Sequence, residues 1–195
     1  MNIDSRRSIK EMIVSQKAVS IWLTGLSGSG KSTLAYELDS SLSTQGYLTA
    51  VLDGNKVRKG LNSNLGFSML DRMENIRRAA EVSKILVENG VIAINAFIAP
   101  TEKIRQMAKS IVGEDDFILI YLSSPLEICE KRDVKGYYAK ARGNSLPDFT
   151  GISSAYEIPK NANLILDTAK HNIDECVEKL VSFIIPKISG KISYS

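Results

Sequence analysis

The chain has 195 residues, of which 44% are apolar and 24% are charged, and this composition excludes a disordered chain. Its 25 Lys and Arg residues stand against 22 Asp and Glu residues, and a formal net charge of +3 is too small an excess to indicate a nucleic-acid-binding surface. The length suits one domain with its own hydrophobic core.

Strand-like and helix-like patterns alternate along the chain from residue 19 onward. Short apolar runs indicate buried strands, and five of them occur, at residues 19–24, 48–53, 91–96, 117–122 and 164–166. Amphipathic spacing, capping residues and flanking Gly or Pro predict helices between these runs, at residues 31–45, 68–89, 100–112, 125–129 and 173–185. Pro100 is expected at the first position of its helix. The alternation predicts an α/β fold, with a five-stranded parallel sheet and helices on both faces.

The turn after the first predicted strand has the composition of a phosphate-binding loop. Residues 25–32 read GLSGSGKS and match the pattern G-x-x-x-x-G-K-[ST] between a predicted strand and a predicted helix. Backbone N–H groups of such a loop point at phosphate oxygens, and the helix start adds its positive dipole end. We expect Lys31 to reach the outer phosphates and the Ser32 hydroxyl to bind Mg²⁺. The expected nucleotide-binding residues are Gly25, Ser27, Gly28, Ser29, Gly30, Lys31, Ser32 and Thr33.

Two classes of nucleoside-triphosphate protein fit such a loop. A GTPase switch needs a guanine-reading Asn-Lys-x-Asp motif, and residues 55–58 match its first two positions but have Arg58 where the aspartate is required. A small-molecule kinase needs an acid near the acceptor hydroxyl and cations around the transferred phosphoryl group. Asp53 ends the second predicted strand on the side of the loop. It either caps the next turn or orients the acceptor and a Mg²⁺-bound water, and we favour the second role.

The rest of the chain divides into a domain and its flanking segments. Residues 1–17 are expected to form an N-terminal extension, residues 18–187 the P-loop domain and residues 188–195 a tail, with the chain loosely held from Pro186 onward. Within the domain, residues 132–150 contain several cations, two glycines and few apolar side chains. We therefore expect a mobile lid rather than a packed element there.

The cysteines, the histidine and the apolar runs limit the context of the protein. Cys129 and Cys176 have neither metal-ligand nor disulfide-framework spacing, so we expect reduced thiols that pack as small apolar side chains. His171 is the only histidine, which excludes sites that need two. No segment has the pattern of a signal peptide or of a membrane span of about 20 apolar residues. These features predict a cytoplasmic protein that binds no membrane.

Several further motifs resemble those of adenylylsulfate kinase, in the same order along about residues 5–185. They occur at residues 52–54, 57–62, 65–68, 72–78, 96–98, 132–142 and 149–152. The resemblance implies the P-loop kinase fold, with ATP and Mg²⁺ as cofactors. It also implies transfer of the γ-phosphoryl group of ATP to the 3′-hydroxyl of adenosine 5′-phosphosulfate, and a homodimer.

The resemblance also implies roles for individual residues. Arg58, Arg72 and Asn75 would hold the phosphosulfate and base region of the acceptor. Phe67 and Phe149 would sandwich its adenine. Independently of the resemblance, we expect Lys31 and Asp53 to act in catalysis together with Arg132 and Arg142, which flank the lid and could neutralise the phosphoryl charge. Asp53 is expected to share Mg²⁺ with Ser32. The remaining acceptor-binding residues would be Asn55, Ile98, Ala99, Lys135 and Asp148.

This sequence departs from the usual pattern of that family at four positions, which are Asn55, Lys59, Ala99 and Glu102. Asn55 stands where a second acid is usual, and Glu102 stands where an arginine is usual. Both change the charge expected beside the acceptor pocket. A related kinase acting on the 3′-hydroxyl of another 5′-modified nucleotide, such as cytidine diphosphoramidate, is therefore an alternative. A nucleotide-binding relative without catalytic activity is a third hypothesis.

Overall fold

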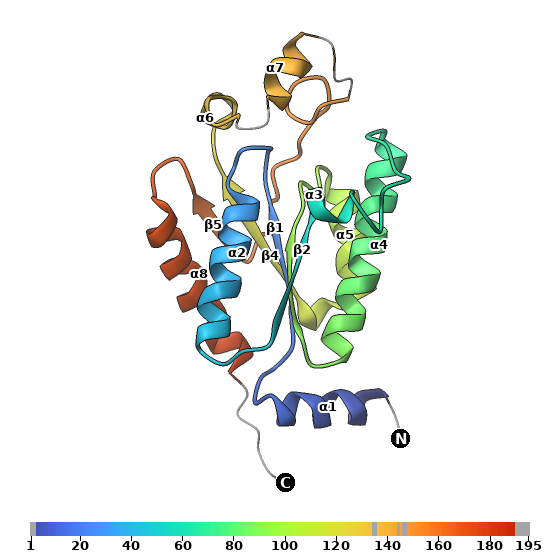
Figure 1. Cartoon of the computed structure of the whole chain (residues 1–195), viewed down its shortest axis with the longest axis vertical. Helices are drawn as coiled ribbons and strands as arrows, with labels where there is room; N and C mark the ends of the chain where they lie inside the picture. The colour runs from blue at the N-terminus through green and yellow to red at the C-terminus, as the bar shows by residue number, and fades with distance from the viewer. Residues whose placement is uncertain (1–2, 134–135, 144, 146–147, 190–195) are drawn as a thin grey trace.

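The computed structural model describes residues 3–133, 136–143, 145 and 148–189. Five parallel strands form one sheet in the order β2-β3-β1-β4-β5. Helices α2 and α8 cover one face of this sheet, and α4 and α5 cover the other (Figure 1). The predicted α/β architecture is confirmed. The strands are β1 (Ser20–Thr24), β2 (Thr49–Asp53), β3 (Ile92–Ala96), β4 (Phe117–Ser123) and β5 (Leu164–Asp167), and the covering helices are α2 (Lys31–Thr44), α4 (Met69–Glu88), α5 (Glu102–Val112) and α8 (Ile173–Ile188).

The strands are apolar on both faces because the sheet is buried on both faces. In β1, the side chains of Ile21 and Leu23 pack in the cluster formed with α2 and α8, whereas Trp22 between them packs in the cluster formed with α4 and α5. Each fully buried side chain of this size contributes about 1.5–3 kcal/mol to stability. The two clusters fix the sheet, and the sheet fixes where the loops at the carboxyl ends of the strands begin.

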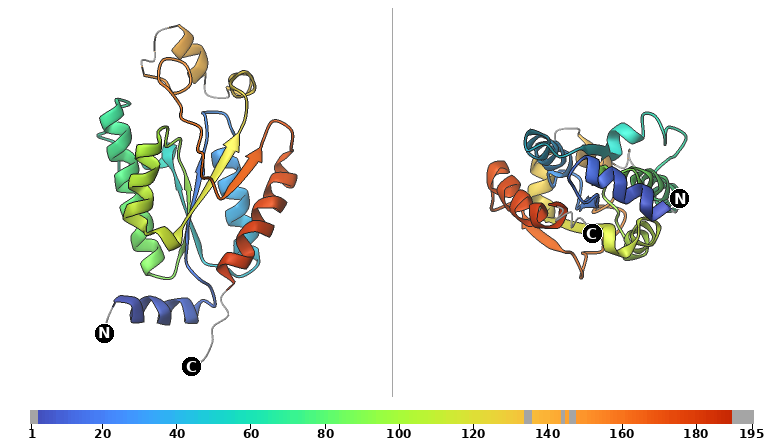
Figure 2. Two further views of the ribbon diagram at one scale, coloured as in Figure 1. Left: turned by 180° about the vertical axis from the view of Figure 1, so that it is seen from behind. Right: turned by 90° about the horizontal axis from the view of Figure 1, so that it is seen from below.

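A helix that the sequence did not predict, α1 (Ile3–Ile13), lies across the end of the sheet opposite the lid (Figures 1 and 2). Arg7 holds it there: its guanidinium donates to Asp116 Oδ1 at 2.8 Å and Oδ2 at 2.5 Å, and to the Ala18 carbonyl at 2.9 Å. Glu11 accepts from Arg7 Nε at 3.0 Å and from the Ala18 N–H at 2.8 Å. The N-terminal extension is thus a packed element.

The structure also differs from the prediction at Pro100, directly after β2 and at the end of α8. Pro100 lies outside α5, because Thr101 is the N-cap and accepts from the Ile104 N–H. A short helix, α3 (Gly54–Val57), follows β2 directly. The expectation that the chain is loosely held from Pro186 was wrong for its first residues, because α8 continues to Ile188, which is fully buried.

The lid region also contains more packed structure than we expected. Helix α6 (Leu126–Lys131) precedes it, and α7 (Tyr137–Arg142) lies within it. A small cluster joins Cys129 of α6, Tyr138 and Ala141 of α7, and Phe149. The prediction that residues 132–150 lack a packed element was therefore wrong for α7, whereas mobility of the lid stays a prediction. Cys129 and Cys176 are both buried free thiols, as expected. Among the described residues, no helix is long and apolar enough to span a membrane.

The Arg7 contacts predict a measurable role for α1 in stability. Replacing Arg7 with leucine leaves the Asp116 carboxylate without its bidentate partner, and hydrogen bonds to charged groups contribute about 1.5–3 kcal/mol. Because both side chains are partly exposed, we expect Arg7→Leu to lower the free energy of unfolding by about 1–2 kcal/mol in urea denaturation. The matched control is Arg6→Leu at an exposed position of the same helix, which should change it by less than about 0.5 kcal/mol. Equal losses in both variants would contradict the assignment.

Candidate active site

The phosphate-binding loop joins β1 to α2 and approaches two neighbouring chain segments closely. A Cβ atom at Gly25 would lie 2.8 Å from the Leu122 carbonyl oxygen, and one at Gly28 would lie 2.6 Å from the Cys129 carbonyl oxygen. Both glycines also have positive φ, 151° and 77°. Only glycine fits these positions without displacing β4 and α6. The predicted loop therefore forms a tight turn between β1 and α2.

Side chains from the surrounding segments fix this loop from outside. Tyr138 of the lid donates to the Ser27 carbonyl at 2.9 Å, and Thr168, after β5, donates to the Ser29 carbonyl at 3.0 Å. Lys31 folds along the loop and donates from Nζ to the carbonyls of Gly25 at 2.9 Å and Leu26 at 2.6 Å. Sequence reasoning missed Tyr138 and Thr168, because nothing local to either residue indicates its contact with a loop more than 100 residues away.

Asp53 lies where β2 ends and is buried, with 4% of its surface exposed. Its Oδ2 accepts a hydrogen bond from the Ser32 hydroxyl. Its Oδ1 accepts from the backbone N–H groups of Asn55 at 2.8 Å and Lys56 at 3.2 Å, which makes Asp53 the N-cap of α3. The capping interpretation of this aspartate is confirmed. Asp53 also contacts the first turn of α2, and its role in orienting the acceptor and a Mg²⁺-bound water stays a prediction.

The pair Ser32 and Asp53 fits a magnesium ion that also binds phosphate oxygens. A hydroxyl and a carboxylate are ligands that Mg²⁺ prefers, and Mg²⁺ usually completes its shell with water and substrate phosphates. Within the described part of the chain, no group of three or more His, Cys, Asp or Glu side chains could hold a metal by itself. The donor set therefore suits a metal that arrives with a nucleotide.

Four residues predicted to bind the acceptor meet between α4 and the lid. The Arg58 guanidinium lies 4.5 Å from the centre of the Phe67 ring. Arg72 donates to the Phe67 carbonyl at 2.8 Å and to the Asp148 carbonyl at 2.6 Å, which joins the loop before α4 to the end of the lid. Burial lowers the pKa of both Arg58 and Arg72 from the usual arginine value, yet arginine stays charged in proteins. The guanidinium groups of Arg58 and Arg72 thus lie together in a partly buried region beside the exposed ring of Phe67.

The two predicted base-stacking aromatics differ in their surroundings. Phe67 is 49% exposed, whereas Phe149 is 7% exposed. Phe149 packs edge-on against Tyr138, with ring centres 5.0 Å apart, and against Tyr137 at 6.4 Å. In this structure Phe149 is a core residue of the lid, and its contact with a base stays a prediction.

The other predicted acceptor-side residues are placed as follows. The amide oxygen of Asn75 is buried and accepts from Asn62 Nδ2 at 2.9 Å, so Asn75 holds the loop before α4. Asn62 was not a predicted site residue, although it lies in the family motif at residues 57–62. The Asn55 N–H binds Asp53, as described above. Lys135 lies outside the described residues.

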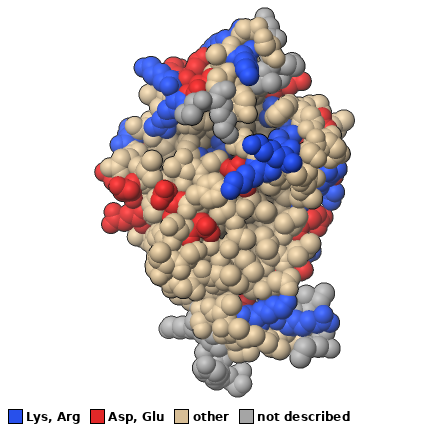
Figure 3. Space-filling view, in the orientation of Figure 1, with Lys and Arg blue, Asp and Glu red and all other residues tan. Residues whose placement is uncertain are grey.

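The two arginines that flank the lid are engaged with protein partners. Arg132, at the end of α6, donates to the Thr168 carbonyl at 2.6 Å. Arg142, which is 58% exposed, forms an ion pair with Glu130 at 2.9 Å. The hydrogen bond between them raises the pKa of Arg142 and lowers that of Glu130. Basic side chains gather in the upper part of the molecule, around the lid and α3 (Figure 3).

The loop after β3 carries Ile98 and Ala99 and lies against the end of β1. Thr24, the last residue of β1, donates from Oγ1 to the Ile98 carbonyl at 2.5 Å, and the Tyr156 hydroxyl lies 3.0 Å from the same Oγ1. Burial raises the pKa of Tyr156. Glu102 pairs with Arg105 at 2.8 Å on α5. The expectation that Glu102 adds negative charge to the acceptor pocket therefore needs correction, because an adjacent cation neutralises it.

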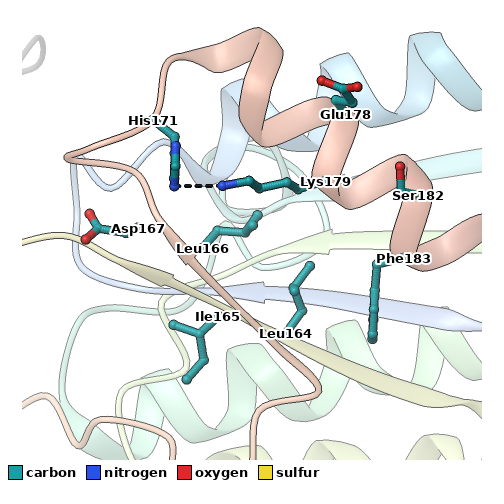
Figure 4. A pocket seen from close by; sticks show the side chains of 9 residues that line it. All are labelled: Leu164, Ile165, Leu166, Asp167, His171, Glu178, Lys179, Ser182 and Phe183. Atoms are coloured by element: carbon teal, nitrogen blue, oxygen red, sulfur yellow. Dashed lines mark hydrogen bonds between the residues drawn. The ribbon is translucent and has the colours of Figure 1, made fainter.

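A separate surface groove of about 680 Å³ lies between the edge strand β5 and α8. Figure 4 shows its lining, in which Lys179 Nζ and His171 Nε2 lie 2.7 Å apart. None of the predicted site residues that the structure describes lines this groove. The site described above is instead built from the loops at the carboxyl ends of the strands.

Comparison with known proteins identifies relatives over almost the whole chain. The sequence model of the adenylylsulphate kinase family matches residues 17–167. An adenylyl-sulfate kinase from Bacteroides thetaiotaomicron is 52% identical over 185 residues, which are 95% of this chain and 92% of that protein. One from Clostridium kluyveri is 47% identical over 93% of this chain and 91% of that protein.

A solved structure agrees with these sequence matches. The Mycobacterium tuberculosis APS kinase CysC, in complex with AMPPNP and APS, superposes with a TM-score of 0.83 at 40% identity, over 86% of this chain and 98% of that one. The matched sequence includes the phosphate-binding loop, Asp53 and the loops around Phe67 and Ile98. On sequence and on structure, the chain belongs to the adenylylsulphate kinase family.

Proposed function

We propose that this protein phosphorylates the 3′-hydroxyl of adenosine 5′-phosphosulfate with the γ-phosphoryl group of ATP. The observation that carries the proposal is the contact between Ser32 and Asp53, which joins the phosphate-binding loop to the strand end beside the acceptor loops. The adenylyl-sulfate kinases that are 47–52% identical to this chain support the choice of acceptor.

On the donor side, the roles follow from the chemistry of phosphoryl transfer, which needs positioning and charge stabilisation more than covalent help. The loop backbone and Lys31 would bind the phosphates, and Lys31 would exchange its two carbonyl partners for phosphate oxygens. Ser32 and Asp53 would hold Mg²⁺, which supplies charge neutralisation at the β- and γ-phosphates. Asp53 would also accept a hydrogen bond from the acceptor hydroxyl and orient it.

On the acceptor side, Arg58 and Arg72 would bind the phosphosulfate, together with Asn75. Their partly buried position strengthens such a pairing, because a cation with little water around it attracts an anion more strongly. The exposed ring of Phe67 is available to stack on the adenine. Phe149, Asn55, Asp148 and the backbone of Ile98 and Ala99 would complete the pocket.

The lid would bring the remaining cations to the transferred group. Arg142 is held by Glu130 in an exposed ion pair, and such pairs add little to stability, so Arg142 can change partner easily. Lys135 and Arg132 would act with it. As the lid closes over the bound nucleotides, it would also exclude water.

We further propose a cytoplasmic homodimer. The resemblance to the family supports the homodimer. The buried free thiols support the cytoplasmic location, because they suit a reducing compartment. A related protein, the APS kinase from Thiobacillus denitrificans, is described as hexameric, at 27% identity and a TM-score of 0.66. This chain covers 30% of that longer chain, so its assembly need not be the same.

An acceptor panel tests the proposed reaction directly. The protein is incubated with MgATP and a set of 5′-modified nucleotides that includes adenosine 5′-phosphosulfate and cytidine diphosphoramidate, and 3′-phosphorylated products are measured. We expect turnover of adenosine 5′-phosphosulfate, with the cytidine compound inert, because the close relatives are adenylyl-sulfate kinases. Turnover of the cytidine compound alone would establish the alternative kinase. Tight ATP binding without any product would establish a binding protein.

Asp53→Asn tests the proposed catalytic acid. Asparagine is as good an N-cap as aspartate, so α3 should stay intact. ATP affinity should stay within about three-fold while kcat falls by about 10²–10⁴-fold, the usual range for a positioned acid–base group. The matched control is Asp167→Asn: this residue also ends a strand and accepts from two following N–H groups, but it does not contact Ser32. Its kcat should stay within about two-fold. A near-normal kcat for Asp53→Asn would refute the assignment.

Hydrogen exchange tests closure of the lid. Helix α7 has only six residues and touches the rest of the protein mainly through Tyr138 and Ala141, so it should open easily without ligand. Adding ADP and the acceptor together should slow amide exchange in α7 by at least about five-fold, while exchange in β1 should stay the same. Unchanged exchange in α7 would mean that the lid is static.

A further inference from the structure

Two arginines near the acceptor site each bind the carbonyl of a residue with unusual backbone geometry. Ala99 has φ 41° and Asp148 has φ 54°, the left-handed region that non-glycine residues rarely adopt. Arg105 donates to the Ala99 carbonyl at 2.9 Å, and Arg72 donates to the Asp148 carbonyl at 2.6 Å. Strained backbone of this kind persists where surrounding contacts over-determine it, and it concentrates at functional sites.

Arg105 is the more deeply buried of the two, with 2% of its surface exposed against 8% for Arg72. A buried guanidinium is costly unless its charge is paired and its donors are used. One edge of Arg105 pairs with the Glu102 carboxylate, from Nη2 at 2.8 Å and from Nε at 3.2 Å. Its other nitrogen binds the Ala99 carbonyl. The planar fork therefore connects the first turn of α5 to the strained residue just before it.

The chain that follows the lid supports the same loop from a second side. The Glu157 N–H donates to the Pro100 carbonyl at 2.8 Å, and the Glu157 carboxylate accepts from the Glu102 N–H at 2.7 Å. In addition, Thr24, just before the phosphate-binding loop, donates to the Ile98 carbonyl. The loop 98–101 is thus connected to α5, to the return of the lid and to the nucleotide loop.

We propose that Arg105 is a positioning residue for the acceptor nucleotide. By holding the Ala99 carbonyl, it keeps Ala99 in the left-handed conformation that sets the direction of the Ile98–Ala99 backbone. Glu102 neutralises Arg105 and so permits its burial. The proposal rests on the proposed function, which assigns that backbone to the acceptor site. Arg105 does not itself touch a substrate.

Arg105→Met keeps the aliphatic part of the side chain but removes the guanidinium with its three donating nitrogens. We expect the KM for adenosine 5′-phosphosulfate to rise by about ten-fold or more, the size of effect typical of a lost hydrogen bond to a charged group, with ATP affinity within about two-fold. Arg105→Lys keeps the charge but cannot bind Glu102 and Ala99 with one planar fork, so its effect should be intermediate. An unchanged acceptor KM in a folded Arg105→Met variant would overturn the proposal.

Glycine at position 99 separates positioning from general damage to the fold. Glycine adopts positive φ without strain, so the loop should depend less on Arg105 when Ala99 is replaced. In a double-mutant cycle, Arg105→Met should therefore raise the acceptor KM several-fold less in the Ala99→Gly background than in the wild-type background. A merely structural role for Arg105 predicts the same factor in both backgrounds, and that result would overturn the proposal.

The only tryptophan provides a readout that needs no substrate. Trp22 is buried, and its ring centre lies 5.5 Å from that of Phe97, the residue before the loop. Arg105→Met should change the Trp22 emission spectrum of the wild-type protein. The same substitution should change the spectrum less when it is made in the Ala99→Gly background. If the wild-type protein does not phosphorylate adenosine 5′-phosphosulfate, the proposed function fails, while the fluorescence cycle still tests the loop. Identical emission in the wild type and Arg105→Met would count against Arg105 as the residue that holds the loop.

Discussion

The hydroxyl of Ser32 and the carboxylate of Asp53 meet across an intervening strand, and the arrangement of the site depends on this contact. Strand β3 lies between β1 and β2 in the sheet. Neighbouring strands are about 4.8 Å apart, so the ends of β1 and β2 are separated by about 10 Å. Two side chains close the distance: Asp53 is the last residue of β2, and Ser32 lies in the first turn of α2, after the phosphate-binding loop. The phosphate-binding loop and α3 then stand on either side of the end of β3, where the loop of Ile98 and Ala99 begins.

The features that could be predicted from the sequence are those encoded by neighbouring residues. The strands, most helix ends and the phosphate-binding loop depend on short-range periodicity and on glycines at fixed spacing, so their positions were predicted within a few residues. Helix α1 was missed because its position depends on Arg7 meeting Asp116, 109 residues later. Thr24, Tyr138 and Arg105 were missed for a different reason: each donates to a backbone carbonyl, and a carbonyl carries no signal in the sequence.

The positions at which this sequence departs from its family also become clearer in three dimensions. In the sequence alone, Glu102 stands where the family usually has an arginine, which would reverse the charge near the acceptor. In the structure its carboxylate faces Arg105 and Gln106, and their hydrogen bonds, that from Gln106 first, lower its pKa and keep it ionised. The charge is thus neutralised within α5. Asn55, which stands where a second acid is usual, donates from its backbone N–H to Asp53. Asp53 therefore keeps its carboxylate at this position without a second acid two residues later.

The position of α1 determines where a tag or a fused domain would lie. Helix α1 and the end of α8 lie at the same end of the molecule, and the lid lies at the other end (Figure 1). Lys17, in the segment after α1, donates from its N–H to the Ile188 carbonyl at the end of α8. A tag, a solid support or a second folded domain attached at the α1 end or at the end of α8 would therefore be attached at the end of the molecule opposite α7. If the lid closes as proposed, a fusion at either end would be attached far from its path.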